Sequence, residues 1–139
     1  MERTPAIADT GFVVALLNRL DIMHNNVTSV YIQQKQILLP QTVLAEVAYL
    51  IGSNAGSETL VAFLKGLSAS RFILVSLTDQ DIIRVAEILD EYADSRIDFV
   101  DASVMAIAER FDIQRILTLD QRDFRLFRPH HCDCFEILP

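Results

Sequence analysis

The chain has 139 residues, of which 51% are hydrophobic and 22% are charged, and its formal net charge at pH 7 is −7. This length favours one domain spanning residues 1–139, and the apolar share is large enough for a core, which excludes a disordered chain. Its two cysteines, Cys132 and Cys134, are too few for the disulfide framework of a small secreted protein, so we expect a cytoplasmic location. No apolar run approaches the roughly 18 residues that a membrane span needs, so we expect none.

Short apolar runs alternate with amphipathic segments along the chain. A buried strand is expected at residues 6–8, further short strands at 37–39, 72–75 and 115–119, and a short edge strand at 135–138. Helices are expected at residues 11–20, 24–35, 42–52, 58–68 and 97–110, with one more that begins after a capping Thr78. This alternation predicts an α/β fold with a mainly parallel sheet.

Two carboxylates lie alone in long uncharged stretches. Asp9 is the only charged residue in the stretch 4–18, and Glu46 is the only one in the stretch 36–57. Burying an ionised carboxylate costs several kcal/mol unless a cation or hydrogen-bond donors compensate it. Neither stretch contains a basic residue, so the compensation must come from elsewhere, and a metal ion is one candidate.

Asp101 and Asp120 extend this acidic set. Asp9 and Asp120 follow two predicted strands, so both should project at the rim where the strands of a parallel sheet end. Asp101 shares a helix face with apolar Met105, so it should face the core. Convergent carboxylates suit Mg²⁺ or Mn²⁺ and predict phosphodiester hydrolysis by a metal-activated water, with one or two ions bound.

Several charged residues near this set can also have purely structural roles. Asp98 can cap the helix that carries Asp101, and Asp123 can occupy the first turn of a helix. Arg122 and Arg125 are either phosphate contacts or parts of a solvated surface. The net negative charge argues against a nucleic-acid partner, although two bound divalent cations would cancel four negative charges.

Four motifs in fixed order resemble those of the PIN-domain ribonucleases, and among them the small bacterial toxins of the VapC type. The matching segments are ADTG at residues 8–11, VLAEV at 43–47, DFVDAS with AIAER at 98–110, and LTLDQRDF at 117–124. Each motif alone is weak, whereas the ordered set covers nearly the whole chain and is specific.

The resemblance implies a PIN-like three-layer α/β/α sandwich around a short, mainly parallel central sheet, formed by a single PIN domain over residues 1–139. It assigns Mg²⁺ or Mn²⁺ binding to Asp9, Glu46, Asp101 and Asp120, with Asp123 as a further ligand and Thr10, Thr118 and Asp98 in support. The implied activity is endonucleolytic cleavage of RNA. The implied partners are the RNA substrate, a small antitoxin protein and a second copy of the chain.

The sequence leaves a second class of function open. The serious alternative is a non-catalytic PIN-type module that binds RNA or protein. A nucleotide cofactor is not expected, because no glycine-rich phosphate loop follows the first strand. The tail from His130 to Cys134 contains zinc-type ligands but lacks a second pair to complete a site, so it is interpreted as a turn before the last strand. The toxin and housekeeping roles both remain open.

Overall fold

The computed structural model describes residues 4–54 and 56–139. Five short strands form one sheet: β1 (Ala6–Ala8), β2 (Ile37–Pro40), β3 (Phe72–Val75), β4 (Arg115–Leu117) and β5 (Glu136–Leu138). Their order across the sheet is β3-β2-β1-β4-β5, and every neighbouring pair is parallel. The predicted α/β class is therefore confirmed, and the predicted last strand is an edge strand.

Helices follow most strands within the described part of the chain. They are α1 (Thr10–Leu17), α2 (His24–Gln33), α3 (Gln41–Asn54), α4 (Ser57–Gly66), α5 (Asp79–Glu91), α6 (Phe99–Arg110) and α7 (Gln121–Leu126). Two 3₁₀ turns, η1 (Leu67–Ala69) and η2 (Ala93–Ser95), follow α4 and α5. None of the described helices is both long and apolar enough to cross a membrane.

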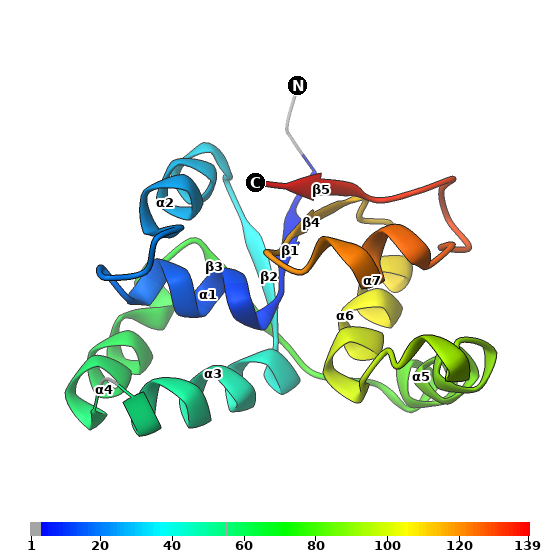
Figure 1. Cartoon of the computed structure of the whole chain (residues 1–139), viewed down its shortest axis with the longest axis horizontal. Helices are drawn as coiled ribbons and strands as arrows, with labels where there is room; N and C mark the ends of the chain where they lie inside the picture. Colours follow the sequence, from blue (N-terminus) through cyan, green and yellow to red (C-terminus); the bar gives the residue numbers. More distant parts are fainter. Residues whose placement is uncertain (1–3, 55) are drawn as a thin grey trace.

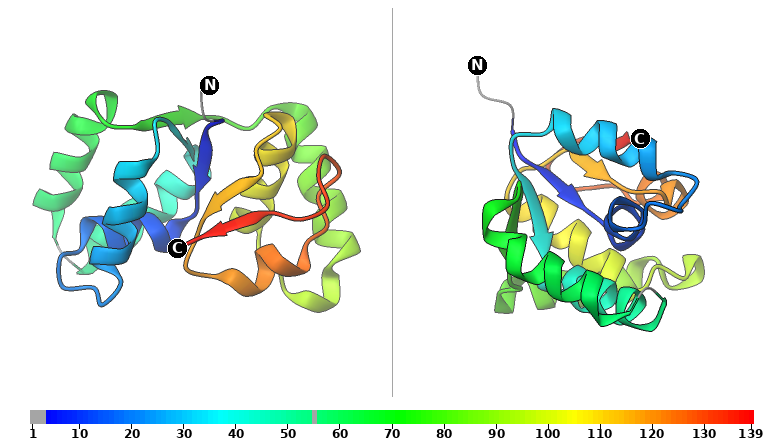
Figure 2. Two further views of the ribbon diagram at one scale, coloured as in Figure 1. Left: turned by 90° about the horizontal axis from the view of Figure 1, so that it is seen from above. Right: turned by 90° about the vertical axis from the view of Figure 1, so that its left-hand side faces the viewer.

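The helices cover both faces of the sheet (Figure 1). Helix α6 lies against the central strands β1 and β2 on one face, whereas α2 and α7 lie on the opposite side (Figure 2). Strand β1 and the middle of α6 are completely buried, and residues 102–108 of α6 are buried on all sides. The core therefore forms around β1 and α6, and it holds rigid the two elements from which Asp9 and Asp101 project.

Local hydrogen bonds move two predicted boundaries. Strand β4 ends at Leu117 rather than at residue 119, because the Thr118 hydroxyl accepts a hydrogen bond from the backbone N–H of Asp120 at 2.9 Å and turns the chain. Helix α6 begins at Phe99 rather than at residue 97, because Asp98 is extended and its carboxylate accepts from the Asp101 N–H at 2.8 Å. Asp98 is thus the helix cap, as one of its two sequence interpretations predicted.

The starts of α5 and α7 are set by residues that the sequence analysis singled out. Thr78 caps α5 as predicted, and it forms a reciprocal capping box with Asp81. Helix α7 was predicted only through the interpretation that places Asp123 in the first turn of a helix, which the structure confirms, because six residues are too few for a visible hydrophobic period. Its first turn begins immediately after Asp120, which brings Asp123 to the same edge of the sheet as Asp120.

Candidate metal centre

The direction in which the sheet grows reverses beside β1. The chain runs from β1 outward to β2 and β3 on one side, and β4 and β5 lie on the other side. Such a reversal is a topological switch point, where ligands bind outside the carboxyl ends of the strands. Asp9 leaves the end of β1, and its backbone N–H donates to the Leu117 carbonyl at the end of β4 at 2.9 Å. Asp9, the first of the predicted acids, therefore lies at the topological switch point of the sheet.

Three of the predicted acids come together at this edge. Single carboxylate oxygens of Asp101, Asp120 and Asp123 all lie within 4.8 Å of one another. Asp101 comes from the first turn of α6, whereas Asp120 and Asp123 come from the start of α7. Asp101 and Asp123 are buried, and Asp120 is exposed, so the group is open to solvent on one side.

Asp9 interacts with this group, and Glu46 interacts with Asp9, through their negative charges. Asp9 is 5% exposed, and the negative charges of Glu46 and Asp120 both raise its pKa. Glu46 is half-buried on α3 and does not belong to the group of three oxygens. Helix α3 is tied to α6 by a 2.6 Å hydrogen bond between the hydroxyls of Thr42 and Ser103. Sequence reasoning did not find this hydroxyl pair; its only signal was a polar residue on each of two strongly apolar helices.

Burial and like charges raise the pKa values of the buried acids. Burial raises the pKa of Asp9 to about 6, an effect that hydrogen bonds from the Thr10 backbone and the Thr118 hydroxyl reduce. Burial together with the charges of Asp9, Asp98, Asp120 and Asp123 raises the pKa of Asp101 to about 9. The protein alone thus disfavours ionisation of these carboxyls, which is the arrangement that a bound cation would relieve.

Two hydroxyl groups complete the surroundings of Asp9. Thr118 is fully buried and donates to Asp9 Oδ2 at 3.1 Å, which fixes the orientation of that carboxylate. Thr10 is 6% exposed, and its Oγ1 has no hydrogen-bond partner within residues 4–54 and 56–139. Buried hydroxyls are normally paired, so an unpaired one beside the acids indicates a site for a polar ligand or an ordered water.

These residues fit a hard divalent cation. Carboxylate oxygens dominate the donor set, several of the carboxyls resist ionisation without a positive charge, and Thr10 offers an unused hydroxyl. Mg²⁺ and Mn²⁺ prefer such oxygen ligands and retain part of their water shell. The donor set lacks the thiolate and imidazole ligands that zinc prefers.

The basic residues and the tail occupy separate positions. Arg122 is exposed and forms a 3.3 Å ion pair with Asp123, which offsets part of the acidic charge, while Arg125 is exposed on α7.

The tail from His130 to Cys134 turns into β5 as predicted. His131 Nε2 lies 2.7 Å from the Ile113 carbonyl and therefore donates to it, and Cys132 Sγ lies 3.6 Å from the same nitrogen. Among the residues that the structure describes, Asp101, Asp120 and Asp123 are the only group of three or more His, Cys, Asp or Glu side chains whose ligand atoms lie within 4.8 Å of one another.

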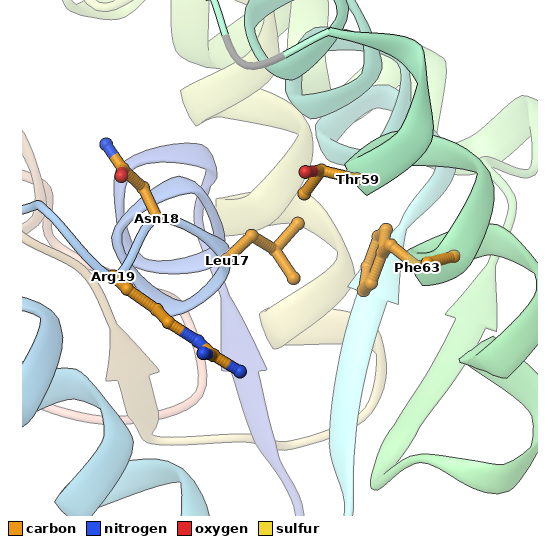
Figure 3. A pocket seen from close by; sticks show the side chains of 6 residues that line it. Leu17, Asn18, Arg19, Thr59 and Phe63 are labelled. Carbon is orange, nitrogen blue, oxygen red and sulfur yellow. The ribbon is translucent and has the colours of Figure 1, made fainter.

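A separate pocket of about 580 Å³ opens at the far end of α1 from Asp9 (Figure 3). Leu17 and Phe63 approach each other across it, from α1 and α4, and Arg19 lies at its edge. A neighbouring cavity of about 510 Å³ shares these three residues and extends to Tyr31 and Ile32 of α2. The two cavities are thus lined by both apolar and polar side chains, and none of the acids described above lines them.

A family model decides the classification. The model of the PIN domain matches residues 6–128, which include every acid described above. The chain is a PIN-domain protein. The family named by the four motifs is therefore confirmed, and the PIN-like sheet order agrees with it.

Known PIN proteins resemble the chain over most of its length. It is 29% identical to ribonuclease VapC26 of Mycobacterium tuberculosis over 134 residues, which cover 96% of this chain and 99% of that protein. The crystal structure of VapC20 from the same species, a sarcin-ricin loop cleaving toxin, matches with a TM-score of 0.73, 23% identity and coverage of 80% and 86%. VapBC2 of Rickettsia felis, bound to a promoter DNA fragment, matches with a TM-score of 0.71, 16% identity and coverage of 96% and 98%.

Proposed function

We propose that this PIN-domain protein is a Mg²⁺- or Mn²⁺-dependent endoribonuclease that cleaves RNA phosphodiester bonds with a metal-activated water. The observation that carries the proposal is the group of Asp101, Asp120 and Asp123 oxygens that lie within 4.8 Å of one another. The PIN-domain match and the similarity to a protein named as a ribonuclease support the same activity. No other group of nucleophile and base is needed for this chemistry.

Asp9, Glu46, Asp101 and Asp120 would hold one or two ions, with Asp123 as a further ligand. A bound ion supplies a centre that lowers the pKa of water and stabilises negative charge on the phosphate. The Thr118 hydroxyl holds the Asp9 carboxylate in place, and Asp98 fixes the start of α6 and so the position of Asp101. Arg122 and Arg125, exposed on the adjoining helix, are the proposed phosphate contacts.

The biological role that we propose is that of the toxin in a toxin–antitoxin pair. The similarity to VapC20, named as a toxin, and to VapBC2 supports this role. The same proposal implies that the protein is a cytoplasmic homodimer and that it binds a small antitoxin. It also implies that residues 1–139 form a single domain. No step of the proposed chemistry requires a membrane or a nucleotide cofactor.

The deciding experiment is cleavage of a mixed RNA pool by purified, antitoxin-free protein in Mg²⁺, Mn²⁺ or EDTA. Wild-type protein and the variant Asp90→Asn, which alters an exposed acid of α5, should cleave in either metal and not in EDTA. Asp9→Asn should fold and should not cleave. Cleavage in EDTA would refute metal dependence, and absence of cleavage by folded wild-type protein would favour the non-catalytic binding module.

A further inference from the structure

The segment between α7 and β5 contains both cysteines of the chain, and the proposed ribonuclease chemistry uses neither. Cys132 and Cys134 are free thiols separated by the single residue Asp133. Cys134 is exposed, whereas Cys132 is half-buried. A single free thiol indicates no site by itself, so the position of the two thiols relative to each other decides whether they act together.

The Cys132 side chain is turned toward Cys134. Its Sγ donates to the Cys134 carbonyl oxygen at 3.4 Å, so the sulfur of the first cysteine lies against the backbone of the second. Two residues of fully extended chain span about 6.6–7.2 Å, and the bend at residues 130–134 shortens this span. The Cα atoms of a disulfide are commonly about 4.4–6.8 Å apart. The bend therefore brings the two cysteines into the range of a disulfide.

Both ends of this bend are held by the rest of the fold. The His130 N–H donates to the Glu109 carboxylate at 2.7 Å, and His131 Nε2 donates to the Ile113 carbonyl at 2.7 Å. On the other side of the cysteines, Phe135 is buried in the core. Because the span between these anchors is short, the two thiols stay close together, and their effective concentration for an intramolecular reaction is high.

The surroundings of the two thiols differ. Burial raises the pKa of Cys132, and the negative charges of Cys134 and of nearby acids raise it further. Because the thiolate is the nucleophile, Cys132 reacts poorly with dissolved reagents. Cys134 is exposed, so a dissolved reagent reaches it first. The exposed cysteine is thus suited to a first attack, and the half-buried one to a second attack within the chain.

We propose that Cys132 and Cys134 form a thiol–disulfide exchange site for small dissolved disulfides of the glutathione type. The Cys134 thiolate attacks one sulfur of the dissolved disulfide, which forms a mixed disulfide and releases one thiolate. The Cys132 thiolate then attacks Cys134 Sγ, which closes the protein disulfide and releases the second thiolate. The released thiolates take up the two protons that the cysteines have lost. The dissolved disulfide is thereby reduced to two thiols, and the cysteines are oxidised.

The resulting disulfide is a reversible one. It closes a loop with a single residue between the cysteines, so it restricts the unfolded chain little and gains little stability from that restriction. Disulfides of this labile kind respond to the ratio of dissolved disulfide to thiol and do not act as permanent structural links. The site is independent of the proposed ribonuclease function, because it needs neither RNA nor a bound metal.

The first test incubates the folded protein in EDTA with mixtures of reduced and oxidised glutathione. Free thiols are then blocked with N-ethylmaleimide, and the intact chain is weighed by mass spectrometry. Wild type should accumulate one species that is lighter by two hydrogen atoms, takes up no N-ethylmaleimide and reverts in excess reduced glutathione. A stable mixed disulfide or a covalent dimer as the end product would overturn the inference.

Two serine variants test the order of the two attacks. Cys132→Ser should stop at a mixed disulfide between glutathione and Cys134, because the second thiol is missing. Cys134→Ser should form its mixed disulfide more slowly, because the remaining thiol is half-buried. Equal rates for the two variants would contradict the assigned roles.

A final comparison measures what the fold contributes. If the anchored bend holds the thiols together, half-oxidation of the folded protein should need several-fold less oxidised glutathione than half-oxidation of the chain unfolded in urea. His131→Phe, which removes the hydrogen bond to Ile113, should shift the folded value toward the unfolded one. Equal requirements for the folded and unfolded chains would overturn the inference, since the pair would then react as it does in any flexible peptide.

Discussion

Replacing Asp9 by asparagine should stabilise the metal-free protein at neutral pH while it removes activity. Asp9 is buried at the end of β1, and burial raises its pKa from an ordinary value of 3.8 to about 6. At about 1.36 kcal/mol per pH unit, this difference destabilises the ionised folded state by about 3 kcal/mol. Asparagine has no charge to bury, and its carbonyl can still accept from the Thr118 hydroxyl.

The sign follows from proton binding. Between pH 3.8 and about 6, the folded wild-type protein binds more protons at Asp9 than the unfolded chain does, so the Asp9 contribution to stability is lost as pH rises. Asp9→Asn lacks this loss. The difference in free energy of unfolding between variant and wild type should therefore widen, in favour of the variant, by about 2–3 kcal/mol from pH 4 to pH 8.

Urea unfolding followed by far-UV circular dichroism in EDTA measures this difference at each pH. Asp90→Asn is the matched control, because it makes the same substitution at an acid that is exposed on α5. Saturating Mg²⁺ should recover much of the stability of wild type and little of that of Asp9→Asn. Parallel curves of free energy against pH for Asp9→Asn and wild type would refute the reasoning, because burial of a charge at Asp9 would then have no energetic effect.

Three other predictions concern metal binding and the helices that support the site. Mn²⁺ at tenfold excess over its Kd should stabilise wild type by about 1.4 kcal/mol, or roughly 5 °C in Tm, and Asp120→Asn should need more metal for the same shift. Arg84→Met should cost about 3 kcal/mol at pH 7 in urea unfolding, because Arg84 holds the half-buried Glu109 carboxylate through two hydrogen bonds of 2.7 and 3.1 Å. Burial opposes ionisation of Glu109, but the hydrogen bonds from Arg84 and from the His130 N–H outweigh burial and lower the pKa of Glu109. The cost of Arg84→Met should therefore diminish as pH falls through the acid range. If that cost is independent of pH, the ion pair with Glu109 is not its cause. Thr78→Ala should cost about 1 kcal/mol and Thr78→Ser much less, because only the serine retains the capping hydroxyl that bonds Asp81; equal losses would show that the cap does not matter.

The local pattern of the sequence determined the elements and their types. The strands at residues 6–8 and 72–75 were predicted with the bounds that the structure has, because each is an apolar run too short for a helix and ends at a polar residue. The Thr78 cap was also predicted, since capping depends on residues only three positions apart. The isolation of Asp9 in an uncharged stretch indicated a buried acid, and Asp9 is buried; Glu46, isolated in the same way, is only half-buried on α3. The ordered motifs identified the PIN family.

Only the tertiary structure decided how these acids relate to one another. Asp9, Asp101 and Asp120 are separated by long stretches of chain, and their proximity depends on the strand order that places β4 beside β1. The convergence of Asp123 with Asp101 needed the short helix α7, which has too few residues for a sequence period. The Thr42–Ser103 hydrogen bond and the raised pKa of Asp101 are likewise properties of packing, since both depend on which distant groups share a buried space. Local residue patterns thus fixed which acids to examine, and the parallel sheet determined that they meet.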